Sequence, residues 1–170
     1  MDDVKGPDTS KEFECLVQTY QTQMRRLCCM ILKDTHLAED AVQETFLKAY
    51  LGMNGFRQES SEKTWLTRIA VNTCRDLMRS RWFRHIDLSV DIAYLPEEAS
   101  KSDPEDMALM DLVLRLPLKQ REVVLLYYYQ NMKTEEIADA LGIAVSSVSE
   151  RLKRAREKLR TALKGVYFNE

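Results

Sequence analysis

Glycine and proline are scarce in this sequence, with five glycines and four prolines among 170 residues. Few tight turns are therefore possible, which disfavours a protein of many short strands and favours an all-α fold. No apolar run approaches the roughly 20 residues that cross a membrane, and the N-terminus lacks the pattern of a signal peptide. We therefore expect a cytoplasmic protein that does not insert into a membrane.

Residues suited to catalysis or metal binding are also few. The four cysteines include no C-x-x-C pair, and two scattered histidines do not complete a metal site. No glycine-rich phosphate loop and no G-K-[ST] motif occurs. Cys28 or Cys29 could lie near His36 as nucleophile and base, but no third group would orient them. We predict no enzyme activity, metal or cofactor, and we assign the cysteines to the apolar core rather than to redox sensing.

The net charge is only −2, but the charges are distributed unevenly. Residues 149–164 contain seven Lys/Arg against two Glu, and residues 59–84 contain six Lys/Arg against three acidic residues. Between them, residues 85–110 contain seven Asp/Glu against one Lys. Two basic regions around an acidic one predict two nucleic-acid-binding modules and a linker. The predicted units are a helical domain at 11–84, an acidic linker at 85–103 and a helix-turn-helix domain at 104–165.

The C-terminal module is predicted from residues 133–164. Thr134 can cap a short helix, Gly142 ends it in a left-handed turn, and a longer basic helix begins near residue 145. This order is typical of a DNA-binding helix-turn-helix, whose second helix enters the major groove by its N-terminal end. The alternative is an amphipathic hairpin with a solvated face. The polar positions that we assign to duplex DNA are Ser146, Ser147, Ser149, Glu150, Arg151, Lys153 and Arg154.

Apolar residues at helical spacing predict the other elements. The expected helices cover residues 13–32, 36–51, 63–79, 104–115 and 119–131. All elements of the chain are then helices, in two small helical domains.

A basic stripe follows the helix that begins near residue 63. Arg68, Asn72, Arg75 and Arg79 are spaced 4, 3 and 4 apart, so they share one face along roughly 16 Å of helix axis. Guanidinium groups suit phosphate contacts, and an Asn side chain can read a base edge. The stripe therefore predicts a second nucleic-acid surface, and the alternative is an ordinary solvated charged face.

Three motifs, in this order, resemble the extracytoplasmic-function group of bacterial sigma factors. They are AEDAVQETFLKAY at 38–50, WLTRIAVNTCRD at 65–76, and a third that runs from 116–122 through 136–138 to 151–156. The resemblance extends over nearly the whole chain, from about residue 13 to residue 163.

The resemblance implies a transcription initiation factor for RNA polymerase. It implies contacts with promoter DNA, the clamp helices of the largest polymerase subunit and the flap of the second largest, by a monomer. It also implies an anti-sigma factor, which in many relatives is anchored in the membrane. The implied polymerase-binding residues are Glu39, Asp40, Gln43, Glu44 and Phe46. The residues implied for binding and melting the proximal promoter element are Arg57, Lys63, Trp65, Arg68, Asn72, Arg75 and Arg79.

One position departs from many members of that group. Where they have a basic residue early in the recognition helix, this chain has Ser149 and Glu150. Glu150 could accept a hydrogen bond from a cytosine amino group, or it could pair with Arg154 one helical turn away. Both interpretations stay open, so base preferences of relatives do not transfer directly.

Two other functions are compatible with parts of the pattern. One is an effector-sensing helix-turn-helix regulator that acts without polymerase, although such a sensor would not need the basic stripe. The other is a helical adaptor that binds proteins through apolar faces. For a sigma factor, we expect that each module alone binds promoter DNA weakly and that the acidic linker covers a basic face in the free chain.

Overall fold

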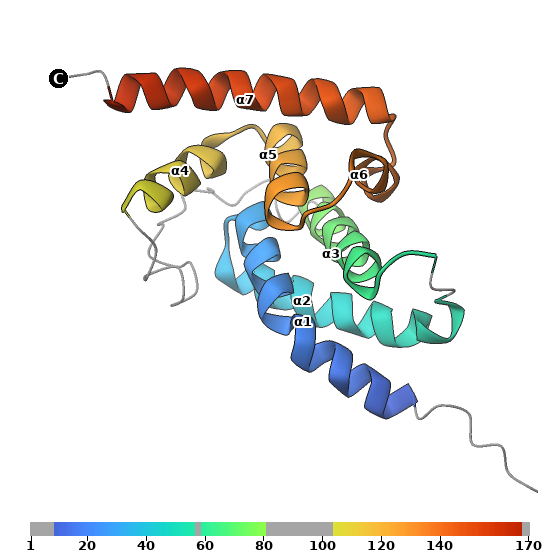
Figure 1. The fold of residues 1–170 in the computed structure, drawn as a ribbon. Coiled ribbons are helices and arrows are strands. Elements are labelled where there is room, and N and C mark those ends of the chain that lie inside the picture. Colours follow the sequence, from blue (N-terminus) through green and yellow to red (C-terminus); the bar gives the residue numbers. More distant parts are fainter. Residues whose placement is uncertain (1–8, 57–58, 81–103, 168–170) are drawn as a thin grey trace, which may run out of the picture.

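The computed structural model describes residues 9–56, 59–80 and 104–167, and it is shown in Figure 1. The elements are α1 (Thr9–Leu32), α2 (Thr35–Gly52), the 3-10 turn η1 (Met53–Gly55), α3 (Glu62–Arg79), α4 (Pro104–Arg115), α5 (Leu118–Val124), the π-helical turn η5 (Leu125–Tyr129), α6 (Thr134–Leu141) and α7 (Val145–Tyr167). Within these ranges there is no strand, so the all-α prediction is confirmed. The predicted linker at 85–103 lies outside the described residues, and its boundaries stay a prediction.

The first three helices pack against one another as the N-terminal unit. The Asp34 carboxylate caps α2 by accepting a hydrogen bond from the Leu37 backbone N–H at 2.9 Å. The Ser61 hydroxyl caps α3 in the same way, accepting from the Thr64 N–H at 3.1 Å. These caps fix where both helices begin, one residue earlier than the apolar spacing predicts.

The C-terminal unit contains a change in helix type that the sequence did not predict. In place of one helix over 119–131, α5 passes directly into η5. There the Gln130 N–H donates to the Leu125 carbonyl at 3.1 Å, which is the wider i→i+5 pattern of a π-helix. Leu125 and Leu126 are buried, while Tyr128 and Tyr129 are exposed. The short π-helix therefore keeps its leucines in the core and its last two tyrosines at the surface.

The turn between α6 and α7 has the predicted geometry. Gly142 has a φ of +63°, a conformation that costs glycine little, and the Ile143 N–H donates to the Ala138 carbonyl at 3.0 Å. The predicted cap is wrong by one position, because Thr134 is the first residue of α6. The start of α6 is held by the Glu136 carboxylate, which accepts from the Lys133 backbone N–H at 2.8 Å.

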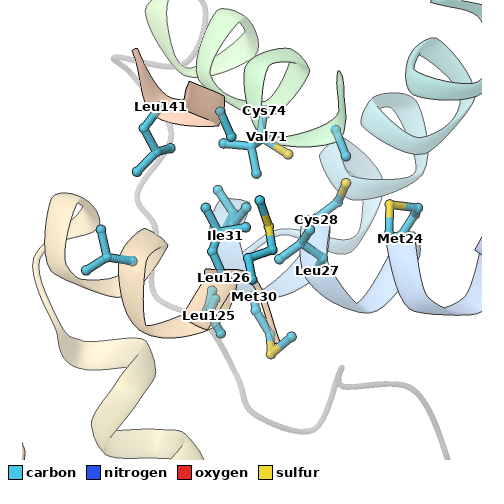
Figure 2. Close-up of a cluster of buried hydrophobic side chains, with 14 of the residues drawn as sticks. Met24, Leu27, Cys28, Met30, Ile31, Val71, Cys74, Leu125, Leu126 and Leu141 are labelled. Atoms are coloured by element: carbon cyan, nitrogen blue, oxygen red, sulfur yellow. The ribbon is translucent and has the colours of Figure 1, made fainter. Parts of the chain in front are cut away.

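The two units share a continuous core. Figure 2 shows Ile31 of α1, Val71 of α3, Leu126 of η5 and Leu141 of α6 in one apolar cluster, and all four are buried. The buried Arg121 guanidinium adds polar contacts, donating to the Ile31 carbonyl at 2.8 Å and to the Leu114 carbonyl at 3.1 Å. In Figure 1, α3 and α6 lie side by side, in agreement with their direct contacts. The sequence predicts two modules but gives no sign of this interface.

Candidate nucleic-acid and polymerase interfaces

The basic stripe of α3 lies on one face, as predicted, but part of that face is already occupied. The Arg68 guanidinium forms a two-point ion pair with Asp139 of α6, with N–O distances of 2.7 and 3.4 Å. Asn72 and Arg79 are exposed, and Arg79 pairs with Asp76 of its own helix at 3.5 Å. The stripe thus divides into a half that contacts α6 and a half that faces solvent.

Arg75 makes the most buried contact of the stripe. Its Nε donates to the Glu122 carboxylate at 3.1 Å, and its Nη1 donates to the Leu141 carbonyl at 2.9 Å. The Glu122 side chain is 1% exposed, whereas the Arg75 side chain is 21% exposed. Burial raises the pKa of Glu122, and the positive charge and hydrogen bond of Arg75 oppose that shift, as do the charges of Arg151 and Arg121. In this conformation, Arg75 is the principal partner of a carboxylate buried in the other unit.

An aromatic pair lies at the start of α3. The rings of Phe56 and Trp65 are stacked with centroids 4.6 Å apart. They line a cavity of about 450 Å³ whose opposite wall is the acidic face of α6, including Glu135 and Glu136. Lys63 is half-buried nearby, and Arg57 lies outside the described residues, so its predicted role has no structural account. Aromatic side chains beside basic ones can hold unpaired bases and their phosphates.

The predicted DNA face of α7 is largely open. Ser146, Ser149, Glu150, Lys153 and Arg154 are exposed, and Ser147 and Arg151 are half-buried. The opposite face packs into the core through Val148, Leu152 and Ala155, as predicted. The Glu150 carboxylate accepts from the Arg154 Nε at 2.8 Å, so the structure contains the intrahelical pair, while a base contact stays untested.

The predicted polymerase-binding residues of α2 separate into two groups. Glu39, Asp40 and Gln43 are exposed, and Glu44 is half-buried and pairs with Lys48 at 2.7 Å. Phe46 is different, because it is only 8% exposed and packs edge-on against Phe13 with ring centroids 6.4 Å apart. Phe46 can stabilise this face by packing beneath it, but it does not form part of the exposed surface.

Sequence reasoning missed the exposed apolar part of α2. Leu47 is 58% exposed, Leu51 is 73% exposed, and Tyr50 lies between them at 48%. Since residues three and four apart share a helix face, Leu47 and Leu51 continue the face of Gln43. In the sequence, these three residues stand among the apolar residues of a helix that is predicted to pack into the core. Their apolar character alone therefore does not show that they point outward.

A second missed feature is an apolar groove between α4, η5 and α7. Its volume is about 560 Å³, and Leu109, Val113, Leu159 and Leu163 line it. Basic residues stand at its rim, and one of them, Arg156, donates to the Tyr128 hydroxyl at 2.8 Å. The groove depends on the π-helical turn that exposes the tyrosines, so the sequence pattern alone could not identify it.

Few features of the described residues suggest catalysis or metal binding. Across 9–56, 59–80 and 104–167, no cluster of His, Cys, Asp and Glu could hold a metal ion. In the same ranges, no helix has the length and hydropathy of a membrane span. Cys28, Cys29 and Cys74 are buried, and only Cys15 is exposed. Burial is the main cause that raises the pKa of Cys29 to about 11, which suppresses its reactive thiolate form.

The fold and these surfaces define a helical DNA-binding protein with a helix-turn-helix and a second basic helix. Residues 16–84 match the family described as Sigma-70 region 2, and residues 106–159 match the family described as Sigma-70, region 4. The chain is 31% identical to the ECF RNA polymerase sigma factor SigW of Bacillus subtilis, over 91% of this chain and 90% of SigW. It is 30% identical to the RNA polymerase sigma-H factor of Pseudomonas aeruginosa, over 90% and 86% of the two chains.

Solved structures agree with this. The sigma factor RpoE in complex with the anti-sigma factor NepR, from Bartonella quintana, has a TM-score of 0.76 at 25% identity, covering 91% of this chain and 98% of that one. CnrH in complex with the cytosolic domain of CnrY has a TM-score of 0.67 at 26% identity, covering 92% and 90%. The chain belongs to the extracytoplasmic-function group of sigma factors. It is an alternative sigma factor that directs RNA polymerase to promoters, and not an enzyme.

Proposed function

We propose that the two basic helices divide promoter recognition between them, with α3 binding and melting the proximal element and α7 reading the upstream element as duplex. The observation that carries this is the pair of basic faces on α3 and α7, each opposite a buried apolar face. The working units are residues 11–84 and 104–165, joined by the acidic linker at 85–103. Each interface is weak alone, and the polymerase scaffold brings both to the same DNA.

At the proximal element, the residues divide between bases and backbone. Arg68, Arg75 and Arg79 provide charge for phosphates, and Asn72 offers an amide for a base edge. Trp65 with its neighbour Phe56 provides apolar surface for a base removed from the stack, and Lys63 and Arg57 provide positive charge for its phosphate. Capturing such a base offsets the few kcal/mol that unstacking costs.

At the upstream element, the N-terminal turns of α7 enter the major groove. Ser146, Ser147 and Ser149 can approach base edges, while Lys153 and Arg154 are placed for phosphates. Glu150 holds Arg154 through the 2.8 Å pair until DNA competes for that guanidinium. Arg151 is half-buried, so it contributes from the edge of this face.

Two surfaces fit the polymerase. The acidic Glu39 and Asp40 and the polar Gln43 of α2 suit a basic partner helix, and the exposed Leu47 and Leu51 add apolar area. We assign this composite face to the clamp helices of the largest subunit. The groove between α4, η5 and α7 is apolar with a basic rim, and we assign it to the flap of the second largest subunit.

The same reasoning extends to regulation. Both structural neighbours above were solved with a bound regulator, the anti-sigma factor NepR in one and the cytosolic domain of CnrY in the other. We infer that an anti-sigma factor also binds this chain, in the cytoplasm. Any membrane anchor would belong to that anti-sigma factor.

Run-off transcription with purified core polymerase and genomic promoter fragments tests the proposal. We expect specific transcripts only when the chain and core polymerase are both present. An effector-sensing regulator would instead bind operator duplex tightly without polymerase, and an adaptor would bind no specific DNA. Nanomolar binding of the free chain to promoter duplex at physiological salt would contradict the proposal that each module is weak alone.

A further inference from the structure

The cover over the α3 stripe is itself acidic. Asp139 of α6 pairs with Arg68, and the Thr64 hydroxyl donates to Glu136 at 3.2 Å. Glu122 of α5 accepts from Arg75 at 3.1 Å. Three carboxylates from the C-terminal unit therefore contact the same face of α3 that we assign to the DNA backbone. This packing is direct contact of α3 with α5 and α6, and the expected cover by the acidic linker stays a prediction.

We propose that the acidic face of α6, together with Glu122, is an intramolecular substitute for the promoter strand, and that the free chain is closed against single-stranded DNA. This inference rests on the proposed DNA role of α3. A carboxylate and a phosphate are both anionic oxygen acceptors for guanidinium groups. One face of α3 therefore binds either the C-terminal unit or the DNA strand, but not both.

Geometry makes the competition direct. Arg75 uses its Nε for Glu122 and its Nη1 for the Leu141 carbonyl, so these two nitrogens cannot donate to a phosphate while it holds both partners. The stacked Phe56 and Trp65 line the cavity that α6 closes on the other side. A strand whose base enters that cavity would bring its phosphates toward the carboxylates of Glu135 and Glu136, which repel them.

The closure is selective for one of the two DNA surfaces. Among the described residues, exposed Arg79 forms its ion pair with Asp76 of its own helix, and the DNA face of α7 is open in the same structure. The closed chain can therefore still meet upstream duplex, whereas melting requires that the units separate. The exposed Arg68–Asp139 pair adds little to the interface, whereas the shared apolar core adds more, so opening the chain needs the free energy of polymerase binding to both units.

The test compares the wild type with the double variant Glu136→Gln/Asp139→Asn in the full chain. A glutamine at position 136 can still cap α6, so the helix itself is retained. Glu12→Gln/Glu14→Gln on the exposed side of α1 removes the same charge far from α3 and serves as the control. Binding is measured by fluorescence anisotropy with a labelled mixed-sequence single strand of about 12 nucleotides, and small-angle X-ray scattering follows compactness.

We expect the double variant to expand and to bind the single strand roughly fivefold tighter or more, while the control does neither. Adding Arg79→Ala to the double variant should remove part of that gain. An affinity equal to that of the control overturns the inference, whether or not the chain expands. Arg79→Ala in run-off transcription tests the DNA role of α3 separately, because the Arg79 side chain is 73% exposed and its ion pair is with Asp76 of α3 itself.

Discussion

Helices α3 and α7 have a similar pattern of apolar and basic residues, but their basic faces differ in how open they are. Both are long, amphipathic and basic on one face. The basic face of α7 is open, whereas Arg68 and Arg75 of α3 are held by carboxylates of the C-terminal unit. A charge pattern therefore identifies a polyanion-binding face, but the tertiary packing decides whether that face is free.

The largest expected effect comes from removing the stripe. Replacing Arg68, Arg75 and Arg79 together by Ala should lower open-complex formation roughly 100-fold, at about 1 kcal/mol per lost contact and 1.4 kcal/mol per factor of ten. Polymerase binding should be retained, because the variant leaves α2 untouched. Permanganate footprinting and a polymerase pull-down measure the two quantities. Unchanged promoter opening would mean that the stripe does not bind DNA and that Arg68 and Arg75 serve only their ion pairs with the C-terminal unit.

The matching variant on α7 should have a smaller and simpler effect. Lys153→Ala/Arg154→Ala should weaken binding to promoter duplex about tenfold and reduce the salt dependence by about two phosphate contacts. Since the α7 face is already open, the loss should be the same in the free chain and in the polymerase complex. Arg115→Ala/Lys119→Ala, on exposed positions of α4 and α5, is the charge-matched control. A loss seen only with polymerase would contradict an open α7 face.

Glu122 makes the covered interface sensitive to pH. Burial raises the pKa of Glu122, so between its ordinary and raised values the folded chain binds a proton that the unfolded chain has released. The contribution of this group to stability is complete below the ordinary pKa and is lost as pH rises through the raised one. The free energy of unfolding relative to Glu122→Gln, from urea titrations, should therefore fall across that window. A difference between the wild type and Glu122→Gln that is independent of pH would refute the assignment.

The smallest expected effect concerns the chemical modification of the four cysteines. Iodoacetamide should modify only Cys15, because Cys28, Cys29 and Cys74 are buried and burial raises the pKa of Cys29 to about 11. Mass spectrometry should give the same result for Glu136→Gln/Asp139→Asn, since Cys74 lies in the core side of α3. Labelling of Cys74 in that variant would mean that the N-terminal helices loosen, rather than that the two units separate.

The sequence predicts what depends on local chemistry. Helix limits follow from caps such as Ser61, and the turn at Gly142 follows from the one residue that adopts its backbone angle at little cost. It does not predict what depends on contacts between distant segments. The pairing of Arg75 with Glu122, 47 residues away, leaves no periodic signal. The same holds for the outward register of Leu51, which a helical pattern alone could place on either side.

The most direct test of the covered and open faces is a distance measurement between the two units. Dyes on Glu62→Cys and Ala144→Cys, both exposed positions, can be placed in a Cys15→Ser background, which leaves the buried cysteines unlabelled. Single-molecule energy transfer should be high in the free chain and fall when core polymerase and promoter DNA are added together. Unchanged transfer in the complete promoter complex would contradict the account, because α3 could not then have exchanged α6 for DNA.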